Sequence, residues 1–483
     1  MCFGDGGPGG SRTPKAFAAV LQTVGLATCP LPTQRAESGE FAGLIVAQPH
    51  NSPVARGYPR YVLAVMFGIN LLNYMDRWVA AASAPLIQKE LHIGDALFGL
   101  LGTAFLLVYA VAALPFGFWG DRGVRKTVIG VGVAIWSIAT LFTGFARTYL
   151  QLFLSRAVVG VGEASYYPAG TSLLSDYFPK EQRSRAMSLW GVGSTFGIAI
   201  GFAGGGFIAE KFGWRTAFFF AAIPGLFCAA LAFAMREPKR GSVEQGGPAA
   251  TMTHEANLKS FVNLIRIPTL RATIIAQTLL FFVLASNAFW LPSYLQRRFA
   301  MTPGKAGLLA GIVIVLGGLI GTLAGGWLAD RRALKTARAH LEVGIAGFAA
   351  GAVLITIALI SPLNIGPIPI FVPVFLLTTI CLYLYSGPFT AVSQNVVSPG
   401  LRASAVTLLL FISHVFGDSH STFDVGFLSD HLGHNLQAAL LITSPTLLIL
   451  AAIAAATGLR SVQKDSDAME REWASRATEP ATH

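Results

Sequence analysis

The sequence predicts an all-α membrane protein of twelve transmembrane helices, arranged as two similar bundles of six. Hydrophobic residues make up 53% of the chain and charged residues only 12%, whereas about a quarter of the residues in a soluble domain are charged. The apolar residues form blocks of about twenty residues, the length that crosses ~30 Å of hydrocarbon as a helix. A short motif also recurs at corresponding positions of the two halves.

Each apolar block is expected to be a helix, because backbone N–H and C=O groups cannot stay unpaired in lipid. A hydrophilic stretch rich in Gly, Pro and charged residues divides the blocks into two sets of six. In the first bundle, residues 59–235, we expect helices at 59–86, 96–119, 125–146, 149–174, 184–208 and 214–235. In the second bundle, residues 270–458, we expect helices at 270–295, 305–328, 340–361, 367–390, 402–427 and 435–458.

Three segments lie outside the bundles. Residues 1–58 mix Gly, Pro and Ser around a short apolar run, and we expect a disordered or spurious N-terminal extension. A cleaved signal peptide is the less favoured alternative. Residues 236–269 form the predicted linker, and residues 459–483 form a tail. The four cysteines have neither paired nor metal-ligand spacing, so no metal or cofactor is expected.

Lys and Arg residues gather in alternate loops. The loops after the second, fourth, sixth and eighth helices are richer in these residues than the loops between them. Basic loops remain in the cytoplasm, which predicts cytoplasmic termini in a multi-pass protein of a bacterial inner (plasma) membrane. This placement also accounts for the formal charge of +11, so no nucleic-acid partner is expected.

An internal repeat relates the two bundles. Gly117-Phe-Trp-Gly-Asp121-Arg122 follows the second helix, and Gly325-Gly-Trp-Leu-Ala-Asp330-Arg331 follows the eighth. Because these positions lie six helices apart, they indicate two structurally equivalent halves.

Charged residues lie inside the first and fourth predicted spans, where ionisable side chains are costly and usually face a cavity. The first helix carries Asp76 and Arg77, and the fourth carries Arg156 and Glu163. At a rise of ~1.5 Å per residue, the depth of Asp76 in the membrane lies between the depths of Arg156 and Glu163 on the fourth helix. Burial favours a neutral carboxyl and a nearby guanidinium favours the ionised form. These four residues are therefore predicted to couple protons and bind substrate; a static ion pair between the helices is the structural alternative.

The loop motif predicts a gate at the cytoplasmic side. Its basic residues can pair with Asp121 or with acids of neighbouring helices and hold that side closed. A purely topological role would explain the sign of these charges but not the Gly-Asp-Arg repeat. The predicted gate consists of Gly117, Asp121, Arg122, Arg125, Lys126, Asp176, Arg183, Asp330 and Arg331.

Polar and aromatic residues of both bundles are expected to line a cavity suited to an amphiphile, although aromatic residues near helix ends are also ordinary interfacial anchors. His414 and Asp418 are four residues apart and can hydrogen-bond, either in a proton relay or as a structural bridge. The predicted lining residues are Tyr74, Tyr166, Asn287, Trp290, Tyr383, Tyr385, His414 and Asp418.

The loop motif resembles the signature of the major facilitator superfamily, and Gly160-Val-Gly162-Glu163 is similar to a second motif of that superfamily. Within it, the chain most resembles the Spinster family. The residues that carry this resemblance are Asn73-Tyr-Met-Asp76-Arg77, Gly160-Val-Gly-Glu163-Ala-Ser165-Tyr166, Pro224-Gly225, Trp290-Leu-Pro292, Gly387-Pro388, Phe416-Gly417-Asp418 and Gly426-Phe-Leu-Ser429-Asp430. The resemblance implies the major facilitator fold, and it agrees with coupling roles for Asp76, Arg156 and Glu163. In helix 11 the chain departs from the family, because Ser421-Thr422-Phe423-Asp424 replaces a Ser-Pro and removes an expected kink.

Together these features predict a secondary active transporter, proton-coupled or otherwise driven, that works by alternating access. The resemblance implies a lysolipid- or sphingolipid-like amphiphile as substrate. A proton-coupled symporter of organic anions such as sugar acids is the alternative, because Arg156 suits any carboxylate or phosphate. A membrane sensor or a lipid enzyme is disfavoured, since no cluster has catalytic spacing. The expected partners are a small-molecule or lipid substrate, protons and membrane lipids, and the expected state is a monomer.

Overall fold

The computed structural model describes residues 57–240, 263–334, 336, 338–361, 364–365, 368–398 and 401–478. The predicted extension up to residue 56 and linker residues 241–262 lie outside these ranges. The first-half elements are α2 (Tyr58–Ala82), α3 (Ala84–Leu91), α4 (Asp95–Arg122), α5 (Arg125–Phe145), α6 (Tyr149–Ala164), α7 (Tyr166–Tyr177), α8 (Lys180–Phe212) and α9 (Trp214–Ala234). The second-half elements are α11 (Pro268–Phe299), α12 (Pro303–Ala333), α13 (Ala339–Ile360), β1 (Asn364–Ile365), β2 (Ile368–Pro369), α14 (Phe371–Tyr383), α15 (Ser386–Asn395), α16 (Arg402–Ser413), the π-helical turn η2 (His414–Asp418), α17 (Ser419–His431), α18 (Leu436–Gly458) and α19 (Val462–Thr478).

The fold is that of an all-α membrane protein. Among the described residues, nine helices are each long and apolar enough to cross a membrane. The other three predicted spans do not meet this criterion of length and hydropathy, each for a local reason. The first, α2, carries polar residues at Asn70, Asn73, Asp76 and Arg77; the fourth and eleventh are each divided between two or more elements.

Three of the predicted spans are interrupted. The fourth breaks at Ser165 between α6 and α7, and the tenth breaks between α14 and α15. The eleventh consists of α16, η2 and α17, so it contains a π-helical turn at His414–Asp418 even without the family's proline. Such turns are frequent at functional sites because they re-aim side chains.

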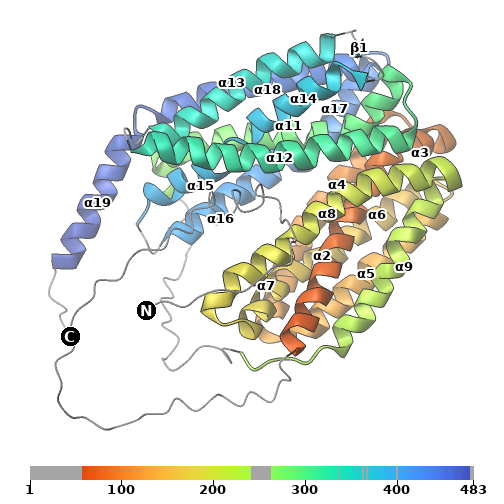
Figure 1. The fold of residues 1–483 in the computed structure, drawn as a ribbon, viewed down its shortest axis with the longest axis horizontal. Helices are drawn as coiled ribbons and strands as arrows, with labels where there is room; N and C mark the ends of the chain where they lie inside the picture. The colour runs from red at the N-terminus through yellow and green to blue at the C-terminus, as the bar shows by residue number, and fades with distance from the viewer. Residues whose placement is uncertain are drawn as a thin grey trace, which may run out of the picture. The chain divides into compact units, whose positions relative to one another are not determined.

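The helices alternate between two ends of the molecule. We call one the basic end, with turns at residues 123–124, 178–179 and 235–240 and with the end of α12 and the start of α13. The other, the opposite end, carries α3 and the turns at residues 92–94, 146–148, 213, 300–302 and 432–435. The two halves pack through α8 against α12 and through α4 against α17. In Figure 1, α8 and α12 converge on the side of α3, which belongs to the opposite end.

Close backbone approach within the first half requires glycine at Gly162 of α6. A Cβ added there would lie 2.6 Å from the backbone nitrogen of Trp136 and 2.7 Å from the carbonyl oxygen of Gly132, both on α5. Backbone atoms cannot move aside as a flexible side chain can. Gly191 of α8 has no atom within 4 Å of the corresponding position, which makes it a matched control.

We expect Gly162→Ala to destabilise the protein by about 1–3 kcal/mol through overpacking. Gly191→Ala should instead raise stability by roughly 0.5–1 kcal/mol, because alanine loses less backbone entropy in a helix. Thermal unfolding of both variants in the same detergent measures the difference. Equal midpoints for the two variants would show that α5 and α6 do not approach as closely as described.

Candidate functional site

Two ion pairs join α2 to α6 inside the first half. Nη1 of Arg156 donates to Oδ1 of Asp76 at 3.2 Å, and the hydroxyl of Thr140 donates to Oδ2 of Asp76 at 2.6 Å. Asp76 is 2% exposed and Arg156 is 4% exposed. Both oxygens of this carboxylate are therefore occupied, and the pair lies away from bulk water.

Arg77 pairs with Glu163, a contact that the sequence did not indicate. Nε of Arg77 donates to Oε2 of Glu163 at 2.7 Å. The side chain of Glu163 is fully buried, and its Oε1 has no hydrogen-bond partner among the described residues. Tyr74, Phe105 and Tyr109 surround the guanidinium, with ring centroids 5.0–5.3 Å from its carbon atom. Asp76 and Arg77, which are adjacent on α2, thus bind opposite charges on α6.

A cavity of about 330 Å³ lies between the halves beside these pairs. Both guanidinium residues, Arg77 and Arg156, line it, whereas Asp76 and Glu163 are absent from its wall. The arginines therefore face the cavity and the carboxylates lie behind them. The remaining wall is mostly aromatic and aliphatic, and its principal members are Tyr74, Trp78, Phe98, Leu101, Phe105, Phe281, Phe289, Ile314, Tyr383, Tyr385, Asp418 and Thr422.

Four of the expected lining residues, Tyr74, Tyr383, Tyr385 and Asp418, are in this wall. The expectation is wrong for three others, which are buried against neighbouring helices. Tyr166 hydrogen-bonds to Asn70 and packs on Trp136 and Trp190. Asn287 donates to Ser444 of α18 at 2.9 Å, and Trp290 is fully buried with its indole N–H donating to the carbonyl of Thr422 at 3.1 Å.

The turn η2 places a His–Asp pair beside the cavity. Nδ1 of His414 lies 2.7 Å from Oδ2 of Asp418. His414 is not in the cavity wall but is half-exposed next to it. Oδ1 of Asp418 is buried and has no hydrogen-bond partner among the described residues. The second half therefore offers the cavity one carboxylate opposite the two guanidinium groups.

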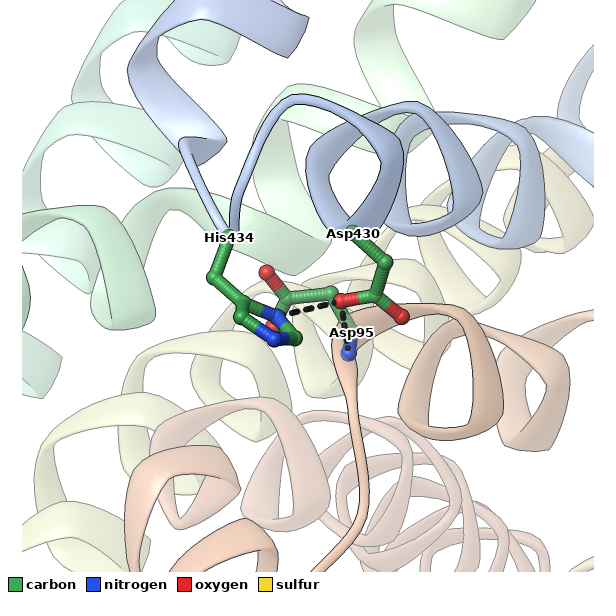
Figure 2. Close-up of side chains that lie close together, drawn as sticks. All are labelled: Asp95, Asp430 and His434. Atoms are coloured by element: carbon green, nitrogen blue, oxygen red, sulfur yellow. Dashed lines mark hydrogen bonds and ion pairs between the residues drawn. The ribbon is translucent and has the colours of Figure 1, made fainter.

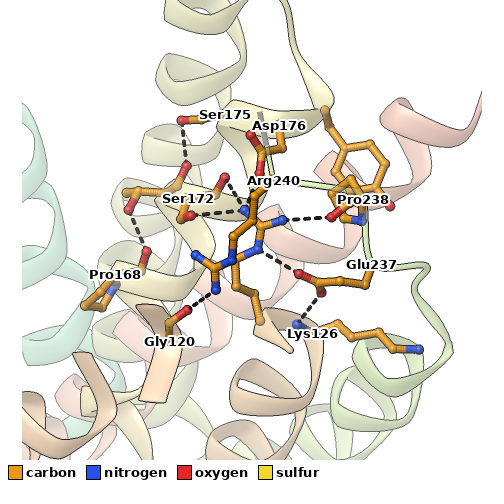
Figure 3. A network of polar contacts seen from close by, with 12 residues as sticks. Gly120, Lys126, Pro168, Ser172, Ser175, Asp176, Glu237, Pro238 and Arg240 are labelled. Atoms are coloured by element: carbon orange, nitrogen blue, oxygen red, sulfur yellow. Dashed lines mark hydrogen bonds and ion pairs between the residues drawn. The ribbon is translucent and has the colours of Figure 1, made fainter. Parts of the chain in front are cut away.

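At the basic end, Arg125 is the centre of a polar network, and Figure 3 labels its partners Asp176, Glu237 and Pro238. Its side chain is fully buried, and it forms an ion pair with Asp176 of α7. Its Nε donates to Glu237 at 2.7 Å, and Nη2 donates to the carbonyl of Pro238 at 3.1 Å. The backbone N–H of Lys126 donates to the second oxygen of Glu237 at 3.0 Å. This network thus holds α5, α7 and the chain after α9 together within the first half.

The described contacts of the other predicted gate residues lie within one half. Arg122 is exposed and stacks on Phe118, and Arg183 donates to the carbonyl of Ser175 at 2.9 Å. Asp330 and Arg331 are exposed, with Arg331 over the ring of Trp327. The side chain of Asp121 lies outside the described part of the chain, and no atom lies within 4 Å of a Cβ placed at Gly117. The latch at this side therefore stays a prediction, and the Arg125 network stabilises the first half.

At the opposite end, a network that the sequence did not indicate does join the halves. Asp95, at the start of α4, is 2% exposed and receives both terminal nitrogens of Arg297, at 2.8 Å and 2.5 Å. Ser429 of α17 donates to it at 2.7 Å and Gln88 at 2.8 Å. Asp430 in turn accepts the backbone N–H of Asp95 at 2.9 Å and contacts Nδ1 of His434 at 2.8 Å (Figure 2).

Asp95, Asp430 and His434 could geometrically hold a metal ion, since their ligand atoms lie within 4.8 Å of one another. Their oxygens already have protein partners, however. The Arg297 guanidinium occupies the carboxylate of Asp95, and backbone N–H groups occupy both oxygens of Asp430. A cation here would have to displace these contacts, so the cluster is explained as a junction between halves.

Comparisons with known proteins agree with this architecture. Residues 66–417 match the model of the Major Facilitator Superfamily. A spinster homolog 1 of Homo sapiens is 30% identical over 397 residues, covering 78% of this chain and 74% of its own. A sphingosine-1-phosphate transporter of Danio rerio is 30% identical over 380 residues, covering 75% of this chain and 74% of its own. The crystal structure of a bacterial homolog of Spinster in an inward-facing, unoccupied conformation superposes with a TM-score of 0.72 at 24% identity, covering 85% of this chain and 99% of that one.

Proposed function

The chain belongs to the Spinster family of the Major Facilitator Superfamily, and on that premise we propose that it is a proton-coupled carrier of an anionic amphiphile. The cavity carries the proposal, because its wall combines two guanidinium groups with aromatic and aliphatic side chains. A phosphate or carboxylate can bind Arg77 and Arg156, while an apolar chain packs against Phe98, Phe281 and Phe289. Charge-assisted bonds of this kind are strong where water is excluded.

The positions of the carboxylates supply a coupling mechanism. Asp76 and Glu163 hold the two arginines from behind, on the side away from the cavity. An anion that binds the guanidinium groups weakens the pull of these groups on the carboxylates. A carboxylate that loses its counter-charge in an apolar site takes up a proton. Substrate binding at Arg77 and Arg156 would thereby promote protonation of Asp76 or Glu163.

Orientation and partners form part of the same proposal. The basic end would face the cytoplasm, and the structure would represent the state in which the opposite end is closed. The substrate would then exchange with the basic side. We propose a monomer in a bacterial inner membrane, with protons and membrane lipids as partners.

Uptake into proteoliposomes under an imposed pH gradient tests the function. We expect a lysophospholipid or a long-chain phosphate amphiphile to move with the gradient, and a sugar acid to move more slowly. Asp76→Asn should weaken the dependence on the gradient, because one of the two carboxylates that can exchange the proton is gone. Glu470→Gln, which removes an exposed carboxylate of α19 outside the cavity and the predicted gate, should transport normally.

Two results would contradict the proposal in different ways. If sugar acids move and amphiphiles do not, the cavity selects the anion alone and the organic-anion symporter is the correct alternative. If Asp76→Asn keeps an unchanged response to the pH gradient, this residue does not couple protons.

A further inference from the structure

Two carboxylates cross between the halves at the opposite end, and each binds the start of a helix in the other half. Asp430, at the end of α17, accepts the backbone N–H groups of Asp95 and Ala96, both at 2.9 Å. Glu210, near the end of α8, accepts the backbone N–H of Gly304 at 3.0 Å. Asp95 and Ala96 begin α4, and Gly304 is the second residue of α12.

The two contacts are equivalent under the internal repeat. The helices α4 and α12 both end in the repeated Gly-Asp-Arg motif. Four residues before Asp430 is Gly426, where a Cβ would lie 2.6 Å from the carbonyl carbon of Asp95. Four residues before Glu210 is Gly206, where a Cβ would lie 3.0 Å from the carbonyl carbon of Pro303. The first half therefore caps the second, and the second half caps the first, at equivalent positions; Asp430 accepts two N–H groups and Glu210 accepts one.

These N–H groups have no side-chain acceptor from their own helix starts, although Thr302 at the N-cap of α12 accepts the backbone N–H of Lys305. The N-cap residue of α4 is Gly94, which has no side chain to accept a hydrogen bond. A Cβ at Gly94 would lie 3.1 Å from the carboxyl carbon of Asp430, so glycine leaves room for the acid. In α12 the first position is Pro303, which has no N–H, and Gly304 therefore offers the first free donor. A helix N-terminus also carries partial positive charge, which attracts a carboxylate.

We infer that Glu210 and Asp430 are positioning residues of the transport cycle, acting as reciprocal helix caps that hold the opposite end closed. Opening that end separates α4 from α17 and α8 from α12, so both caps must break together. The start of α4 then depends on the other half for its capping, and its N–H groups are left to water when the halves part. This inference rests on the proposed carrier mechanism, but its test needs no substrate.

Spin-label distances measure the two ends directly. In full-length protein with its four cysteines replaced, one label pair at Lys89→Cys and Lys305→Cys reports the opposite end. A second pair at Ser184→Cys and Arg332→Cys reports the basic end; all four side chains are exposed. The cysteine-free protein is used only if its midpoint of thermal unfolding matches that of the unmodified chain.

Asp430→Asn should raise the ratio of open to closed molecules at the opposite end about tenfold, with a matching contraction at the basic end. Asparagine has one acceptor oxygen where Asp430 uses two, so one N–H of α4 loses its partner. Glu210→Gln keeps an acceptor and loses only the charge. Its effect should be smaller, roughly threefold, and should fade at high salt because Glu210 is exposed.

Gly94→Ser separates gating from helix stability. A serine at this N-cap position can cap α4 from within its own half and displaces the carboxylate of Asp430. We expect the opposite end to open as in Asp430→Asn, while the unfolding midpoint stays at or above that of the parent. A merely structural cap would give no such opening.

Glu90→Gln is the matched control. Glu90 lies at the same end but binds Trp214 at 2.7 Å and Arg215 at 2.5 Å, both in its own half. The label distances in Glu90→Gln should equal those in the parent protein.

The inference is overturned if Asp430→Asn and Gly94→Ser leave the label distances unchanged, or if Glu90→Gln opens the opposite end as far as they do. Should Asp430→Asn fail to fold, Glu210→Gln and Glu210→Ala decide the question on an exposed side chain. If the parent protein does not transport the amphiphile but the label distances still respond to these variants, the proposed function fails and this inference stands.

Discussion

Arg156→Gln should destabilise the protein by about 3–5 kcal/mol, because it leaves the carboxylate of Asp76 buried without its counter-charge. The size of this effect follows from burial, since the two side chains are 4% and 3% exposed. The double variant Asp76→Asn, Arg156→Gln should recover most of the loss, because a neutral amide pair can replace a buried ion pair at little cost. Chemical unfolding in one detergent, followed by tryptophan fluorescence, compares the variants.

Transport gives a second and independent readout of the same variants. Both the single and the double variant should lose uptake, because neither retains the guanidinium in the cavity wall. The double variant is thus expected to keep most of its stability and to lose transport. If the single and double variants are equally unstable, the contact between Asp76 and Arg156 contributes little, and the static-pair alternative fails along with the coupling role.

Arg125→Ala should have the other large effect, also about 3–5 kcal/mol, because it leaves Asp176 and Glu237 without their shared cation. Arg125→Lys should recover only part of this loss. A lysine has a single ammonium group and cannot reach Nε and Nη partners in the forked geometry of a guanidinium. The midpoint of thermal unfolding measures both variants.

Arg122→Ala is the control for this network. Arg122 belongs to the same motif and carries the same charge, but it is exposed and stacks on Phe118. Its loss should change stability by less than about 0.5 kcal/mol, as for other surface substitutions. Similar losses for Arg122→Ala and Arg125→Ala would mean that the motif acts through net charge and that the buried network is not the cause.

The helices could be predicted because apolar block length is a property of the sequence alone. Contacts between helices depend on rotation about each axis, which residue type does not determine. Asp76 and Arg156 could be paired in advance from their similar depth in the membrane. The partner of Arg77 could not, because adjacent residues on a helix point in different directions. Asn287 and Trp290 have polar atoms suited to a cavity, but α11 turns them toward α18 and α17.

The junction at the opposite end escaped prediction for a different reason. Asp95, Arg297 and Asp430 lie at helix ends, where charged residues are ordinary and carry no signal of a partner. The N-cap of α4 is Gly94, which has no side chain to accept a hydrogen bond from the first N–H groups of the helix. An uncapped helix start of this kind marks a place where another part of the chain must supply the acceptor.

The charged pair in α2 also has a consequence for how the protein enters the membrane. A charged residue at the centre of a span costs roughly 2.5–3.5 kcal/mol during insertion, and Asp76 and Arg77 are adjacent. Their partners, Arg156 and Glu163, are about eighty residues further along the chain and are synthesised later. The first span is therefore expected to remain at the insertion machinery until α6 emerges and neutralises it. Biogenesis of the first half would then proceed as a joint insertion of these helices, and not one span at a time.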